Sequence, residues 1–106
     1  MRKALWLGYD LGVRGDYEGL YAWLDAHQAK ECGDSLAYLD FEYSASLEEE
    51  LAQELRAALT VTKNTRIYVI WHDDCGSIKG RFLVGGRKSA PWSGYAGAVP
   101  AEVDEA

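Results

Sequence analysis

The chain has 106 residues, 48% of them hydrophobic, and a formal net charge of −6. This length suits one domain, and the apolar content predicts a packed core rather than a disordered chain. The acidic balance disfavours non-specific binding to phosphate backbones, which depends on Lys and Arg. No apolar run approaches the roughly 20 residues that span a bilayer, and none resembles a secretory signal. We therefore expect a cytoplasmic protein without a membrane-bound state.

The first strong element is a strand over Ala4–Asp10 that ends in a carboxylate. Its residues are apolar or small on both faces, so both faces can be covered, as for a strand inside a sheet. Asp10 is then expected at the rim of the sheet, where ligands bind in many α/β folds. The alternative is that its carboxylate accepts backbone N–H groups in the following turn.

The glycine-rich loop after this strand contains Arg14, the only basic residue between Lys3 and Lys30. Arg14 is a candidate partner for Asp10 or Asp16, or for a ligand phosphate. The alternative is a solvated loop charge, which is what many surface arginines are.

Two helices are predicted. Asp16 is a good N-cap for a helix over residues 17–29, in which His27 is expected to pack or to complement the C-terminal dipole rather than to bind a ligand. The run Ser46-Leu47-Glu48-Glu49 has the pattern of a capping box, with Glu49 reaching back to the cap N–H. It opens a helix over residues 47–59, whose Glu-rich outer face is a solvated surface.

The remaining elements are extended. Residues 35–43 form either one strand bent at Asp40 or two short strands around a tight turn. Two further strands are predicted over residues 66–73 and 78–84, joined by a hairpin at Asp74-Cys75-Gly76-Ser77. Residues 98–106 are small and acidic and are expected to be a disordered tail, which leaves residues 1–97 as the domain.

The strongest candidate for a reactive or metal-binding site is the run His72-Asp73-Asp74, because a His with two carboxylates can bind a metal or perform acid–base catalysis. Adjacent strand residues point to opposite faces, so at most His72 and Asp74 converge. The alternative is that the two aspartates open a turn. Cys32 and Cys75 lie too far apart for a metal-spacing pair and are expected to be free thiols.

Basic residues cluster late in the chain, and with Trp92 they are the candidate binding residues: Lys79, Arg81, Arg87 and Lys88. This cluster suits nucleic acid or an acidic partner. Alternatively, the charges protect an exposed strand edge from pairing.

The order of elements predicts a ferredoxin-like α+β sandwich, with two helices on one face of an antiparallel sheet and an extra C-terminal strand. This plan, together with Trp6-Leu7-Gly8-Tyr9-Asp10-Leu11 and Arg14, resembles the small subunit of the CRISPR adaptation complex, a family also described as metal-dependent ribonuclease-like. With Asp-Tyr-Glu-Gly-Leu-Tyr at 16–21, the chain is also similar to SinR-like bacterial proteins. The resemblance covers about residues 4–84.

The resemblance implies a homodimer in which the last strand of each chain adds to the sheet of its partner. It also implies that Asp10 of both chains faces a shared cleft and holds a divalent cation such as Mg²⁺. No other cofactor is expected. Few basic residues are available to line a duplex, so the chain departs from the family in this respect.

Two functions follow as hypotheses. The first is a non-catalytic dimeric interaction module that binds protein or nucleic acid through its aromatic tail and basic strand. The second is a divalent-metal-dependent nuclease that uses Asp10. A dimer is favoured because Tyr68, Ile70, Trp71 and Phe82 would otherwise leave large apolar groups on an uncovered face. The alternative is that the tail, with Trp92 and Tyr95, covers this face within one chain.

Overall fold

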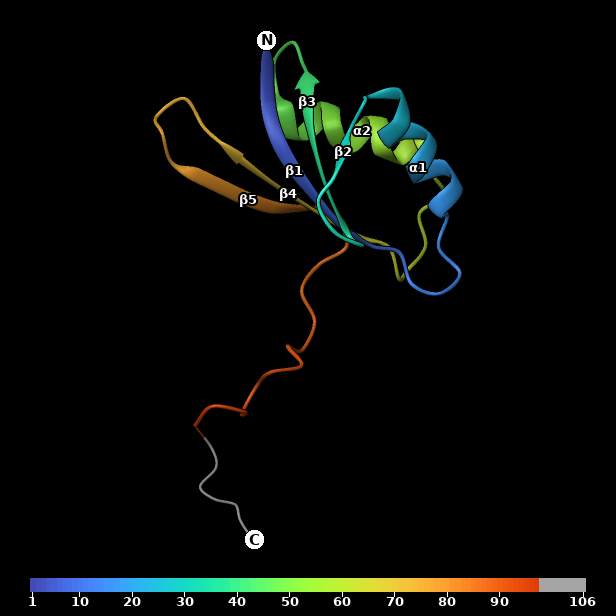
Figure 1. Ribbon diagram of the computed structural model, residues 1–106, viewed down its shortest axis with the longest axis vertical. Coiled ribbons are helices and arrows are strands. Elements are labelled where there is room, and N and C mark those ends of the chain that lie inside the picture. The colour runs from blue at the N-terminus through green and yellow to red at the C-terminus, as the bar shows by residue number, and fades with distance from the viewer. Residues whose placement is uncertain (98–106) are drawn as a thin grey trace, which may run out of the picture.

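The computed structural model describes residues 1–97, and the predicted acidic tail lies outside them. The elements follow as β1 (Arg2–Asp10), α1 (Tyr17–Ala26), β2 (Lys30–Glu31), β3 (Leu36–Glu42), α2 (Leu47–Ala58), β4 (Arg66–His72) and β5 (Ile78–Val84). They form an α+β fold, with both helices on one side of an antiparallel sheet in the order β2-β3-β1-β4-β5 (Figure 1). The first strand lies inside the sheet, as predicted, between β3 and β4.

The register of β1 explains which face of the sheet the helices cover. Leu7 lies opposite Ala37 on β3 and Val69 on β4, and all three are buried. Cross-strand partners share a face, so the alternate residues of three strands form one continuous apolar surface. The stripes of α1 and α2 pack on it, and the fully buried leucines of the core come from both layers: Leu5, Leu7, Leu20, Leu51 and Leu55.

The first helix begins as predicted and ends earlier. The Asp16 carboxylate accepts the Gly19 N–H at 2.9 Å and the Thr60 N–H at 2.8 Å, so it caps α1 and also holds the segment after α2. Helix α1 stops at Ala26 rather than near residue 29. Gln28 has a φ of 56°, and the Ala29 N–H returns to the Leu24 carbonyl at 3.0 Å, which closes the helix.

The cap of α2 differs from the prediction in one residue. The Ser46 hydroxyl accepts the Glu49 N–H at 3.3 Å, as expected. Glu50, rather than Glu49, reaches back, and its carboxylate accepts the N–H groups of Ser44, Ala45 and Ser46 at 2.7–3.0 Å. A charged acceptor for three orphan donors suits the positive end of the helix.

Residues 35–43 form one strand, β3, and not two. Asp40 does not break it, because its side chain lies on the face away from the helices while Leu39 and Phe41 stay buried. The hairpin partner of β3 is instead the two-residue strand β2, which pairs with Ala37 and Tyr38.

The sheet face away from the helices, which we call the open face, carries Trp6, Tyr38, Tyr68, Ile70 and Phe82. These side chains are only partly buried. Within residues 1–97 only one face of the first strand is covered, so cover for its second face would have to come from elsewhere. Trp71 was also expected on this face, but it lies under the helices with 7% exposure, because it alternates with Ile70.

Among the described residues, no helix has the length and apolar character needed to cross a membrane.

Candidate functional site

Two aromatic pairs dominate the open face. Trp6 and Tyr38 have ring centroids 5.1 Å apart and tilted rings, whereas Tyr68 and Phe82 meet edge to face at 4.9 Å. Ile70 follows Tyr68 along β4 and pairs with Trp6 across to β1. These rings provide flat apolar surface with little conformational freedom to lose on binding, which favours contact with a partner.

One cation lies over this surface. The Arg87 guanidinium carbon is 5.7 Å from the ring centroids of both Tyr68 and Phe82, within the range of a cation–π contact. Arg87 is the third residue after the end of β5, and its side chain reaches back over the rings of the last hairpin. The sequence predicted Arg87 as a binding residue, and the structure places it at the edge of the open face.

Asp10 is the last residue of β1 and lies at the rim of the sheet, as predicted, beside the first residue of β4. Its carboxylate pairs with the Arg66 guanidinium at 3.0 Å and accepts the Gly12 N–H at 3.2 Å. The hydrogen bond from Arg66, and then that from Gly12, hold the pKa of Asp10 below its ordinary value of 3.8. Asp10 thus makes the turn contact that was its alternative role, together with an ion pair that the sequence did not indicate.

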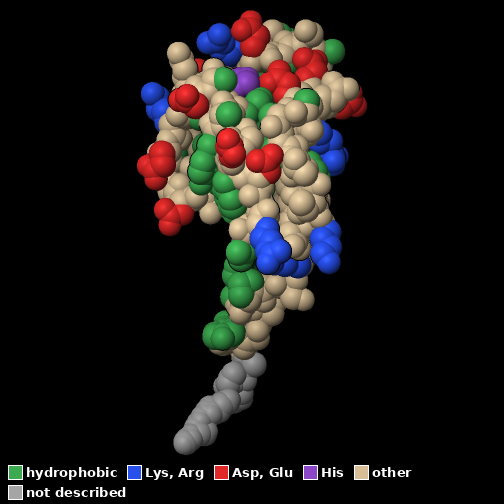
Figure 2. Space-filling view, turned by 90° about the vertical axis from the view of Figure 1, so that its right-hand side faces the viewer, with side chains coloured by type: hydrophobic (Ala, Val, Ile, Leu, Met, Phe, Trp, Pro, Cys, Tyr) green, Lys and Arg blue, Asp and Glu red, His purple; other side chains and the backbone are tan. Residues whose placement is uncertain are grey.

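Asp10 and Arg66 border a cleft of about 290 Å³, which we call the loop cleft. It lies between the β1–α1 loop, the α2–β4 loop and the segment after β5, and its lining residues are Asp10, Gly12, Lys63, Asn64, Arg66, Gly85, Gly86 and Lys88. Figure 2 shows Lys and Arg side chains gathered where the C-terminal segment leaves the body, while Asp and Glu side chains occupy the part above. The loop cleft is therefore locally basic in an acidic protein.

The predicted basic cluster is divided by the sheet. Lys79 and Arg81 lie opposite Trp71 and Val69 on the helix side of β5, where Lys79 approaches Asp73 at 3.8 Å and Arg81 binds Glu48 at 2.9 Å. Arg87 and Lys88 lie beyond the strand end. The cluster is continuous in sequence but forms two separate groups in space.

Two other predicted binding residues stand apart. Arg14 is exposed and makes no ion pair with a residue in the range 1–97. Trp92 is 73% exposed and Tyr95 is 84% exposed, on a segment that extends away from the sheet (Figure 1). Trp92 and Tyr95 therefore do not cover the open face, and the alternative that they do so within one chain is not supported.

The run His72-Asp73-Asp74 does not converge on a metal. Asp73 accepts the N–H groups of Cys75 and Ser77, each at 2.9 Å, and the bond from Ser77 is the largest factor that lowers its pKa. Asp74 binds Lys3 at 2.6 Å. Within the described part of the chain, no group of three His, Cys, Asp or Glu residues could hold a metal ion.

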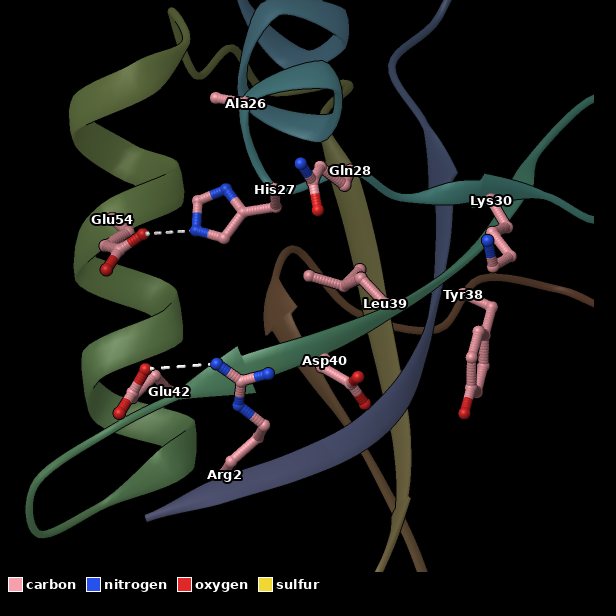
Figure 3. A pocket seen from close by; sticks show the side chains of 10 residues that line it. All are labelled: Arg2, Ala26, His27, Gln28, Lys30, Tyr38, Leu39, Asp40, Glu42 and Glu54. Carbon is pink, nitrogen blue, oxygen red and sulfur yellow. Dashed lines mark hydrogen bonds and ion pairs between the residues drawn. The ribbon is translucent and has the colours of Figure 1, made fainter.

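The largest hollow, about 520 Å³, lies beside β3 and the end of α1 (Figure 3). It exists because β2 is short and leaves the edge of β3 unpaired beyond Tyr38. Its charged residues largely satisfy one another, since Arg2 pairs with Glu42 at 3.4 Å and His27 approaches Glu54 at 3.3 Å (Figure 3). Trp23 also donates its indole N–H to Glu54 at 3.0 Å. Glu54 on α2 thus binds two side chains at the end of α1, so we assign these contacts a role in joining the two helices.

Comparison with known proteins adds no assignment: no family model, curated protein or solved structure matches this chain.

Proposed function

We propose that this protein is a non-catalytic interaction module with a ferredoxin-like fold, and that it pairs with a second copy of itself through the open face. The strand order β4-β1-β3-β2 and the two helices on one side support the ferredoxin-like arrangement, with β5 as the extra strand. The observation that carries the proposal is the aromatic surface of the open face, which stays only partly buried within residues 1–97, with the Arg87 guanidinium over Tyr68 and Phe82 as its one side-chain cover.

The energetics favour closing this face. Fully burying one large apolar side chain yields about 1.5–3 kcal/mol. The five open-face side chains are already half-buried, so each contributes about 1 kcal/mol, and two copies contribute about 10 kcal/mol. This gain exceeds the lower part of the roughly 4–15 kcal/mol lost in joining two molecules. The difference is at most about 6 kcal/mol, so we expect a weak dimer with a Kd of tens of micromolar or above.

The charges around the open face suit a second copy better than a polyanion. Oppositely charged pairs lie near both ends of β1, Arg2 with Glu42 and Asp10 with Arg66. With these pairs neutralised, Arg87 is the one cation over the described part of the face, which is little charge to repel a second copy and too little for the continuous positive field that nucleic acid requires. A two-fold axis would also end the assembly at two chains.

Sedimentation velocity from about ten to several hundred micromolar tests the proposal. The expected mass is twice the 11.8 kDa of one chain. Phe82→Asp places a charge on the open face and should give a folded monomer, with an unchanged far-ultraviolet circular dichroism spectrum. Val13→Asp is the matched control, because Val13 is fully exposed in a loop. A wild-type monomer, or a Phe82→Asp dimer, would overturn the proposal.

A second candidate, a divalent-metal-dependent nuclease, is favoured by one observation: Asp10 lines clefts on both sides of its ion pair with Arg66. The assay compares wild type with Asp10→Asn on RNA and DNA, with and without magnesium. We expect no cleavage. Cutting that requires both magnesium and Asp10 would replace the interaction module with this enzyme.

A further inference from the structure

The loop cleft differs from the rest of this acidic surface in the balance of its charges. Three cations line it, Lys63, Arg66 and Lys88, against the single carboxylate of Asp10. Asp10 is already bound to Arg66 at 3.0 Å and to the Gly12 N–H. Lys63 and Lys88 make no ion pair with another described residue. The cleft therefore has uncompensated positive charge.

Two consecutive glycines, Gly85 and Gly86, line the loop cleft, so its backbone is not shielded by side chains there. Gly85 has a φ of +75°, and a Cβ atom there would lie 2.5 Å from the Thr65 carbonyl oxygen, so the position favours glycine. Gly86 has open space around it. Their N–H groups form no hydrogen bond with another residue of the described chain. Consecutive glycines of this kind let an anion approach main-chain donors closely.

We propose that the loop cleft binds a phosphate group, held by the ammonium groups of Lys63 and Lys88 and by the Gly85–Gly86 main chain. Several phosphate oxygens can accept hydrogen bonds from donors on separate loops, which a single carboxylate matches less well. Arg66 stays on Asp10 and fixes the end of β1 beside the ligand. The phosphate is carried by a nucleotide or by the backbone of a single strand.

This inference does not rest on the proposed dimer, because the groups proposed to hold the phosphate, Lys63, Lys88 and the Gly85–Gly86 main chain, lie on loops beyond the strand ends. A variant Ile70→Asp, which is on the open face but pairs with Trp6 and Gly80 rather than contacting Arg87, should lose the dimer and bind phosphate as wild type does. A loss of the dimer with retained phosphate binding would therefore separate the two proposals.

The test is a titration followed by amide NMR, with inorganic phosphate, adenosine monophosphate and a short oligouridylate as separate probes. The Gly85 and Gly86 amide signals are expected to shift saturably. The double variant Lys63→Gln, Lys88→Gln should bind at least about tenfold more weakly, since each charge-assisted hydrogen bond typically contributes about a decade or more in affinity. Both lysines are exposed, so the fold is expected to persist.

The control is Lys30→Gln with Arg56→Gln, which removes the same charge from exposed sites outside the cleft. It should change the affinity by no more than about twofold. No saturable shift with any probe, or equal weakening in both double variants, would overturn the proposal. Tighter binding of oligouridylate, with a salt slope that falls by about 0.7 per lysine removed, would support a nucleic-acid strand as the source. Equal binding of the mononucleotide would support a free nucleotide.

Discussion

Gly80 on β5 lies directly beside the ring of Tyr68 on β4, so that a Cβ atom at Gly80 would come within 2.6 Å of the Tyr68 hydroxyl oxygen. Gly80 pairs with Ile70 and leaves the space that the Tyr68 ring fills. An aromatic ring packed over a strand glycine compensates for its missing side chain. The edge-to-face contact with Phe82 depends on this space.

Gly80→Ala is expected to displace Tyr68 while leaving the fold intact. The lost aromatic contact costs about 0.5–1.5 kcal/mol, and replacing a strand glycine regains about 0.5–1 kcal/mol, so the free energy of unfolding changes by less than about 1 kcal/mol. Self-association through the open face should weaken. Urea unfolding and sedimentation measure the two effects, and a fully stable dimer in the variant would show that Tyr68 does not lie in the interface.

Acid should destabilise the fold. The pKa values of Asp10, Asp16, Glu50 and Asp73 all lie below their ordinary values, which are 3.8 for Asp and 4.5 for Glu. A carboxylate with a lowered folded-state pKa stabilises the fold fully above its unfolded-state pKa, and this contribution is lost as the pH falls through the folded-state pKa. The free energy of unfolding should therefore be constant near neutrality and fall from about pH 5 downward.

Glu50→Gln isolates one of these groups. The pKa of Glu50 is lowered mainly because its carboxylate accepts hydrogen bonds from the N–H groups of Ala45, Ser44 and Ser46. The variant should be less stable than wild type at neutral pH and should lose less stability on acidification. Glu18→Gln, in the exposed first turn of α1, is the control and should keep the wild-type pH slope. Parallel slopes for Glu50→Gln and wild type would contradict this role.

The strands and helices were predictable where burial follows a simple period. Both helices and the β1, β4 and β5 strands occur within a few residues of their predicted bounds, because their apolar residues alternate or recur at helical spacing. The β2 strand was not predictable: Lys30 and Glu31 are polar, exposed and set by pairing with β3 alone.

The candidate site was less predictable than the fold. Asp10 stood out by its position, but its partner Arg66 is 56 residues away and is brought there by the β1–β4 register. The basic run at 79–88 looked like one surface, whereas the alternation of β5 and its end separate Lys79 and Arg81 from Arg87 and Lys88. The sequence around Lys63 indicates only a turn and does not identify Lys63 as a candidate binding residue. Contacts between loops distant in sequence leave no local pattern.

The covered and open faces should respond differently to truncation. Leu7 is fully buried at the centre of the sheet, so Leu7→Ala should lower the free energy of unfolding by about 2–5 kcal/mol. Ile78 lies on β5 with 70% exposure, so Ile78→Ala should cost less than about 0.5 kcal/mol in the monomer. Urea unfolding of both variants in the Phe82→Asp background removes any contribution of the dimer. Equal losses of unfolding free energy in the two variants would show that the face covered by the helices is not the core.

Gly19 provides the sharpest test of the helix packing, because two principles predict opposite signs. Alanine is favoured over glycine in a helix by about 1 kcal/mol, which predicts that Gly19→Ala stabilises the protein. The Cβ atom would, however, lie 2.7 Å from the Ala58 carbonyl oxygen at the end of α2. A backbone oxygen cannot move without shifting the helix, and overpacking of this kind costs about 1–3 kcal/mol.

We therefore expect Gly19→Ala to lower the free energy of unfolding by up to about 2 kcal/mol despite its better helix propensity. Ala22→Gly, at an exposed position of the same helix, should lower it by about 1 kcal/mol through propensity alone. Urea unfolding at neutral pH compares the two variants with wild type. A stabilised Gly19→Ala protein would mean that α1 and α2 do not approach as closely as their backbones indicate.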